Sequence, residues 1–95
     1  MSTQEALALS ARVRHVVVRT LDLGIVPDQL DDSTSLYSSV IRMDSLALLQ
    51  LLVALEEELH IKIDDEDVMN ANLSTIGSLV EMVRQAMAES ADGAR

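Results

Sequence analysis

The chain contains no cysteine, no phenylalanine and no tryptophan, and Tyr37 is its single aromatic residue. Without cysteine there can be no disulfide, no protein thiolate chemistry and no Cys-ligated zinc, and the absence fits a reducing compartment. Without large aromatic rings the core has to be built from Leu, Ile, Val and Met. These side chains have no fixed ring geometry, and Met in particular adapts to irregular gaps.

Long apolar runs are also absent. The longest one, Leu46 to Leu55, is interrupted by Gln50. It is too short to cross a bilayer, which takes about 20 residues of helix. The N-terminal segment lacks the basic stretch and apolar block of a signal peptide. We therefore expect a cytoplasmic protein that does not bind a membrane.

Positive charge is scarce: 7 Lys and Arg stand against 16 Asp and Glu, giving a net charge of −9. Such a field repels nucleic acid and anionic lipid, and it attracts partners with basic patches. The acids concentrate between Asp44 and Asp67, where Lys62 is the single base. We expect protein partners with basic patches and no nucleic-acid partner.

The chain has 95 residues, of which 48% are hydrophobic. This length is enough for one domain with one modest core. We take residues 1–95 as a single domain with its folded core at about 5–88. The small, polar residues 90–95 are expected to form a disordered tail.

Apolar spacing and capping residues predict four helices, and no strand-like alternation lasts long enough to compete with them. The expected ranges are 3–21, 45–59, 65–71 and 76–89. Residues 22–43 form a long connection, and its scattered apolar residues suggest that it is pinned across the core. The fold class is thus all-α: a four-helix bundle with a long loop between the first two helices and a short third helix.

Caps are predicted at each helix start. Ser2 and Glu5 fit a capping box for the first helix, and Asp44 precedes the second. The third follows Asp64, which has acids after it, and the fourth follows Ser74 or Thr75.

A helical wheel of residues 45–59 places five leucines on one face, the expected core face: Leu48, Leu51, Leu52, Leu55 and Leu59. Leu49 and Val53 lie off this face together with Gln50. One interpretation is a helix buried on more than one side. The other is an exposed apolar patch, rimmed by Glu56 and Glu57, that docks a partner.

Ser45 stands at the start of this apolar helix, where a serine is also common for capping alone. His15 and His60 lie in other segments, and no Lys or His is placed by the sequence to act as its base. The chain is therefore not expected to be an enzyme. If Ser45 reacts, another protein supplies the catalysis.

The tripeptide Asp44-Ser45-Leu46 resembles the Asp-Ser-Leu signature of acyl carrier proteins and the related thiolation, or peptidyl carrier, domains. The segments LVALEEELHIKIDDEDV and LSTIGSLVEMV extend the resemblance over about residues 5–88. It implies that a phosphopantetheinyl transferase, using coenzyme A and Mg²⁺, attaches 4′-phosphopantetheine to Ser45. Asp44 and Leu46 would flank the site, and the thiol of the arm would carry acyl groups as thioesters.

Members of this family can admit an acyl chain between their helices. The resemblance makes six apolar residues candidates for lining such a pocket: Leu48, Leu52, Leu55, Ile63, Val68 and Ile76. Each of them can equally be a plain core residue.

Two positions depart from the family pattern. Arg42 stands where the family usually has glycine, which permits a positive φ. Ala47 and Gln50 stand where fatty-acid carriers usually have acids. Both departures favour a dedicated polyketide, nonribosomal peptide or lipopeptide pathway. We expect a standalone, monomeric carrier that is loaded by ligases and synthases. An aminoacyl or peptidyl carrier and a housekeeping fatty-acid carrier are the alternatives.

Two rival classes need no covalent arm. A small acidic helical adaptor would use the apolar patch alone, and Ser45→Ala would leave its function intact. A divalent-ion site among the acids lacks the EF-hand spacing, so we expect no metal site.

Overall fold

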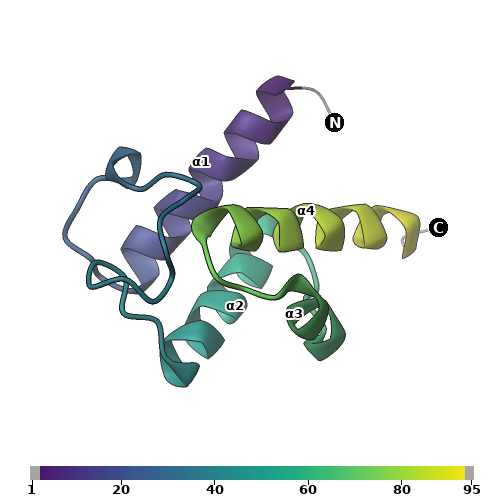
Figure 1. Cartoon of the computed structure of the whole chain (residues 1–95). Coiled ribbons are helices and arrows are strands. Elements are labelled where there is room, and N and C mark those ends of the chain that lie inside the picture. Colours follow the sequence, from purple (N-terminus) through teal and green to yellow (C-terminus); the bar gives the residue numbers. More distant parts are fainter. Residues whose placement is uncertain (1–2, 94–95) are drawn as a thin grey trace.

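The computed structural model describes residues 3–93 of the chain. It contains four α-helices and one short 3₁₀ helix: α1 (Thr3–Thr20), η1 (Pro27–Gln29), α2 (Ser45–Leu59), α3 (Asp65–Ala71) and α4 (Ile76–Gly93) (Figure 1). Within the described range no strand forms, and one isolated antiparallel bridge joins Ser35 to Thr75. The predicted all-α class, long first connection and short third helix are confirmed.

The helix ends need two small corrections. The first helix stops one residue before the expected end, and α4 continues to Gly93 instead of ending at residue 89. Residues 90–93, expected in a disordered tail, therefore continue a helix, while residues 94 and 95 lie outside the described range. Ser2, one half of the expected capping box, also lies outside it.

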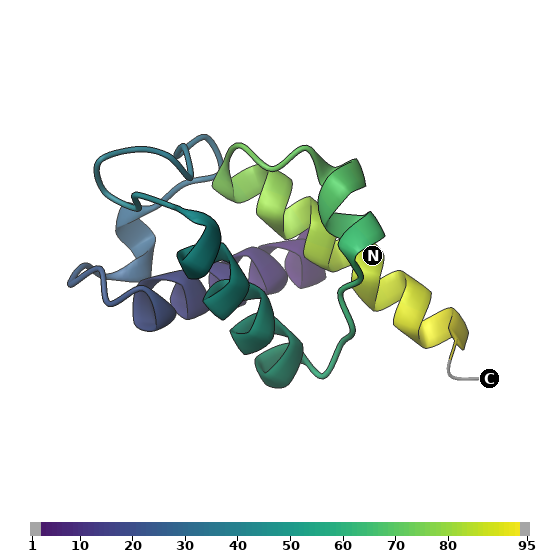
Figure 2. The same cartoon turned by 90° about the horizontal axis from the view of Figure 1, so that it is seen from below.

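The first helix is the centre of the packing. It contacts α2, α4 and η1, whereas α3 packs against α4. Figures 1 and 2 show α4 lying at an angle across α1 and α2, so the helices cross instead of running parallel. The core is aliphatic as expected, and its fully buried side chains are Val13, Val16, Val17, Leu30, Leu36, Leu51, Leu55, Ile76, Leu79, Met82 and Val83.

The long connection is held across the bundle, as its apolar residues predicted. Leu30, Leu36, Ile41 and Met43 are buried in the core. Backbone hydrogen bonds join the connection to the start of α4: the Leu36 N–H donates to the Ser74 carbonyl at 2.9 Å, and the Ile76 N–H donates to the Thr34 carbonyl at 3.0 Å. These bonds and buried side chains order the segment that leads into α2.

Gly77 lets the connection approach α4 closely. Its N–H donates to the Asp32 carbonyl at 2.8 Å, and a β-carbon at this position would lie 3.0 Å from the same oxygen. Thr75 caps α4 nearby, because its hydroxyl accepts the Ser78 N–H at 3.2 Å. This selects Thr75 from the two predicted caps.

Candidate functional site

Ser45 is the first residue of α2 and is exposed. It is placed by Asp44, which has an extended backbone (φ −132°) and whose carboxylate accepts the Ala47 N–H at 2.7 Å. Asp44 is therefore the N-cap, as predicted. On the other side, the Met43 N–H donates to the Leu36 carbonyl at 2.9 Å, which fixes the chain just before the helix. The hydroxyl is thus presented to solvent from an anchored helix start.

Arg42 adopts the left-handed conformation, with φ +54°. Its N–H donates to the Ser38 carbonyl at 2.8 Å, closing a turn, and its side-chain Nε–H donates to the Ser39 carbonyl at 3.2 Å. This is the conformation that glycine adopts without cost and a long side chain disfavours. A glycine, which the resemblance drawn from the sequence leads one to expect here, would fit this turn, and this chain forms it with arginine.

The face of α2 that points away from the core is mostly apolar. Leu46 is 65% exposed, Leu49 59% and Val53 44%, and Gln50 and Glu57 lie exposed beside them. Leu51, Leu55 and Leu59 are buried on the opposite face. The helix is thus not buried on more than one side. We call Leu46, Leu49, Gln50, Val53 and Glu57 the outer face of α2.

Glu56 has a structural role that the sequence did not indicate. Its carboxylate accepts the Ile63 N–H at 2.8 Å, and its carbonyl accepts the N–H groups of His60 and Ile61. The side chain is partly buried, unlike the exposed Glu57. Of the two acids expected to rim the patch, Glu57 is the one that faces outward freely.

Charge is nearly absent around the serine. Between Asp32 and Glu56 the sequence has one base, Arg42, and one acid, Asp44, so the whole net charge of −9 lies outside this segment. The Asp44 carboxylate is turned onto the helix start. No hydrogen bond to Ser45 from a His or Lys side chain is found among the described residues, and His15 and His60 are both exposed. The arrangement holds a hydroxyl but supplies no base for it.

The six candidate lining residues occupy two kinds of position. Leu55 and Ile76 are fully buried core residues. Leu48, Leu52, Ile63 and Val68 are partly buried and pack against the core from its edge. They come from α2, from α3 and from the segment between these helices.

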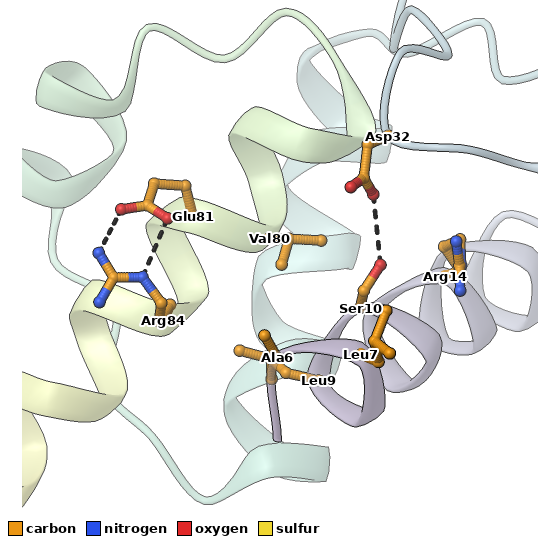
Figure 3. Close-up of a pocket in the computed structure, with 9 residues that line it drawn as sticks. All are labelled: Ala6, Leu7, Leu9, Ser10, Arg14, Asp32, Val80, Glu81 and Arg84. Carbon is orange, nitrogen blue, oxygen red and sulfur yellow. Dashed lines mark hydrogen bonds and ion pairs between the residues drawn. The ribbon is translucent and has the colours of Figure 1, made fainter. Parts of the chain in front are cut away.

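Two cavities of about 240 and 250 Å³ lie elsewhere, between α1 and α4, and none of the six candidates lines them. In the first, shown in Figure 3, the Ser10 hydroxyl donates to the Asp32 carboxylate at 3.3 Å, and Arg84 pairs with Glu81. Arg14 contributes a buried Nε that has no hydrogen-bond partner among the described residues. These polar residues come from three distant segments, so no sequence pattern marked them as neighbours.

The described residues bring together no group of three or more His, Cys, Asp or Glu side chains able to hold a metal ion. None of the helices in the described range is both long and apolar enough to cross a membrane.

The anchored start of α2 presents an exposed serine. Residues 11–83 match the family described as "phosphopantetheine attachment site", and the chain belongs to this family. It is a carrier protein whose cofactor is covalently attached 4′-phosphopantetheine, added by a phosphopantetheinyl transferase and presented to synthase enzymes. The resemblance drawn from the sequence is confirmed.

The residues around Ser45 fit a phosphate group. The first N–H groups of a helix have no partners within the helix and carry its positive dipole end, a favourable place for an anion. In α2 the Asp44 carboxylate already accepts one of them, the Ala47 N–H. Ser45 opens the 15-residue helix α2, and the positively charged Arg42 stands three residues earlier in the chain. Leu46, Leu49 and Val53 expose aliphatic side chains on the same helix.

Proposed function

We propose that Ser45 is the residue that receives 4′-phosphopantetheine, and that the chain carries acyl intermediates on this arm. The observation that carries the proposal is the exposed hydroxyl at the first position of α2, inside the matched residues 11–83. Asp44 and Leu46 flank it, one capping the helix and the other exposing an apolar side chain to an approaching enzyme.

The attachment reaction replaces the phosphoanhydride bond of coenzyme A by a phosphate ester on serine. The Ser45 oxygen forms a bond to the phosphorus that bears the pantetheine group. The pyrophosphate bond of coenzyme A breaks, and adenosine 3′,5′-bisphosphate leaves with the electron pair. The serine proton passes to a base on the transferase, because no basic side chain of the described residues is bonded to Ser45. This chain contributes an accessible nucleophile at a helix start that favours the phosphate.

The cargo is proposed to be an acyl group in a dedicated polyketide, nonribosomal peptide or lipopeptide pathway. What supports this is the apolar outer face of α2, which carries no charge between Ser45 and Leu55, where a housekeeping fatty-acid carrier would have acids. An aminoacyl or peptidyl cargo is the alternative. The family assignment favours a carrier over the acidic adaptor without covalent chemistry.

The outer face of α2 is the proposed docking surface for the loading ligase and the synthases. Leu46, Leu49 and Val53 would contact apolar side chains of the partner, and Gln50 would lie beside them. Glu57 is the exposed acid available to a basic patch. We propose that the carrier acts as a monomer, because the patch is then free for successive partners.

The test of the attachment site is intact mass after incubation with coenzyme A, Mg²⁺ and a broad-specificity phosphopantetheinyl transferase. We expect a gain of one phosphopantetheine in the wild type and in Ser39→Ala, and none in Ser45→Ala. Ser39 is a matched control because it is also an exposed serine of the same region. A gain that persists in Ser45→Ala would assign the arm to another residue.

The acyl pocket has its own test. The same transferase can load an acetyl or an octanoyl arm from the corresponding acyl-coenzyme A. If the chain enters between the helices, methyl resonances of Leu52, Ile63 and Val68 shift with octanoyl and not with acetyl, while exposed Leu49 stays unchanged. Equal spectra for the two arms would make the six candidates core residues only.

A further inference from the structure

Arg42 keeps a conformation that costs free energy, and it does so beside the proposed attachment site. Its φ of +54° lies in the left-handed region. Side chains with a β-carbon are disfavoured in that region. Backbone strain of this kind clusters at functional sites, and it also closes helix ends, as at His60 and Asn72, so an observed outlier is a reason to look for a function. The turn itself needs only the conformation, which glycine would supply without strain. The question is what the arginine side chain adds.

The side chain is exposed and partly anchored. Its Nε–H donates to the Ser39 carbonyl at 3.2 Å, and its two terminal nitrogens have no hydrogen bond or ion pair with any described residue. An Arg guanidinium has five N–H donors in a planar fork that matches phosphate oxygens. Two of the three nitrogens are therefore available to an anion, on a side chain whose base is held by the turn.

The positive charge of Arg42 stands in a segment of the sequence with few other charges. Arg42 is the single base between Asp32 and Glu56, and the nearest acid in sequence, Asp44, is committed to the Ala47 N–H. The chain as a whole carries −9. Coenzyme A, with its pyrophosphate and 3′-phosphate, is also strongly negative and has to approach a protein that repels it. A positive side chain three residues before Ser45 offsets that repulsion locally.

We propose that Arg42 is a phosphate-binding residue: it contacts the coenzyme A phosphates during transfer and then the phosphodiester on Ser45. The proposal rests on Ser45 being the attachment site. During transfer, negative charge passes to the leaving adenosine 3′,5′-bisphosphate while the Ser45 oxygen bonds to phosphorus. Arg42 stabilises that charge without giving or taking a proton, since its guanidinium stays protonated.

The kinetic test compares Arg42→Gln with Lys62→Gln, which removes the same charge from the exposed residue beyond the other end of α2. The assay is transfer from coenzyme A by a broad-specificity transferase, followed by intact mass. We expect Arg42→Gln to lower kcat/KM by about three- to tenfold, the size of one charge-assisted contact near the surface. Lys62→Gln should leave it unchanged, and the difference should shrink at high salt.

Arg42→Gly separates charge from backbone conformation. It relieves the positive φ, so the protein should become more stable, yet transfer should slow as much as in Arg42→Gln. If Arg42 has a purely structural role, transfer should instead be unchanged or faster in Arg42→Gly, because that variant relieves the strain. Arg42→Lys should recover part of the rate, because it keeps the charge and loses the fork.

A second readout needs no enzyme activity. The Nε–Hε resonance of Arg42 should shift between the apo protein and the isolated holo protein, and the shift should fade with added salt. The corresponding resonance of Arg84, which is paired with Glu81, should stay in place. Two results together would overturn the proposal: an Arg42 signal that is the same in the apo and holo proteins, and an Arg42→Gln variant in which the KM for the carrier rises while the KM for coenzyme A does not. They would place Arg42 against an acid of the transferase.

The outcomes also separate this inference from the proposed function. If the wild type gains the arm on Ser45 and the Arg42 variants react at the wild-type rate, the attachment site stands and the phosphate contact is wrong. If the wild type gains no arm, the attachment site itself fails.

Discussion

The carboxylate of Glu56 accepts the backbone N–H of Ile63 at 2.8 Å, seven residues further along the chain. The bond ties the last turn of α2 to the segment that enters α3, and the Glu56 carbonyl accepts two more N–H groups of the same turn. Ile63 packs against the core directly after this bond. Glu56 therefore anchors the segment that leaves α2 toward α3.

Glu56→Ala should lower the free energy of unfolding by about 1–3 kcal/mol, because it leaves the Ile63 N–H without its charged partner. Glu57→Ala is the matched control: this neighbour is exposed, and its removal should change stability by less than about 0.5 kcal/mol. Urea denaturation followed by circular dichroism measures both. Equal losses in the two variants would mean that the Glu56 hydrogen bond contributes nothing in solution.

Asp44 combines a cap and a charge, and two substitutions separate them. Asp44→Ala removes the acceptor of the Ala47 N–H and should cost about 1 kcal/mol. Asp44→Asn keeps a capping oxygen, so its stability should stay near that of the wild type. Transfer assays on the two then show what the charge does: a slow Asp44→Asn variant with normal stability assigns the carboxylate to transferase recognition, whereas a normal rate leaves it as a cap.

Much of the fold follows from local signals in the sequence. The three-and-four spacing of apolar residues and the caps at Asp44 and Thr75 mark helix positions, because both depend on residues a few positions apart. The wheel placed Leu49 and Val53 off the core face but left open whether they are buried or exposed, and the structure shows them exposed. The family motif pointed to Ser45 as the functional residue, while physics alone explained the same serine as part of a helix start.

The remaining features depend on contacts between distant segments. The bond of Glu56 to Ile63 distinguishes it from Glu57, although both are acids on the same helix. The approach of Asp32 to Gly77 explains that glycine, but it joins two positions far apart in the sequence. The family's usual glycine marked residue 42 as a position where a positive φ is common, but neither the φ of +54° at Arg42 nor the bond of its side chain to Ser39 was predicted. The order of side chains along the sequence does not show which distant residues come into contact.

Two glutamates of α4 should affect stability in opposite directions. Asp67 and other acids of the α3 region raise the pKa of Glu89, so the folded state disfavours its charge. Its contribution to stability is present below the unfolded pKa and is lost as the pH rises through the folded pKa. Glu89→Gln should therefore raise the melting temperature at pH 7, with the gain disappearing below about pH 4, the range of an ordinary Glu.

Glu81 supplies the control of opposite sign. The hydrogen bond from Arg84 lowers its pKa, so its contribution to stability is present above the unfolded pKa and is lost as the pH falls through the folded pKa. Glu81→Gln should lower the melting temperature at pH 7 and have no effect in acid. Melting curves from acidic to neutral pH test the pair, and shifts of the same sign in both variants would contradict the assigned causes.

The left-handed positions give the last prediction. Arg42 and His60 both have φ +54°, one before α2 and one at its C-cap. Glycine adopts this conformation without the β-carbon contact. Arg42→Gly and His60→Gly each relieve strain in the folded state but also make the unfolded chain more flexible, which opposes the gain. The net result should be a rise of about 0.5–1 kcal/mol in the free energy of unfolding. For a domain of this size that is a rise of about 2–8 °C in melting temperature.

His60 is the control because it lies at the opposite end of α2 from Ser45. If His60→Gly stabilises and Arg42→Gly does not, the Arg42 side chain itself stabilises the apo fold through its bond to Ser39, and the strain at this turn is smaller than its φ indicates.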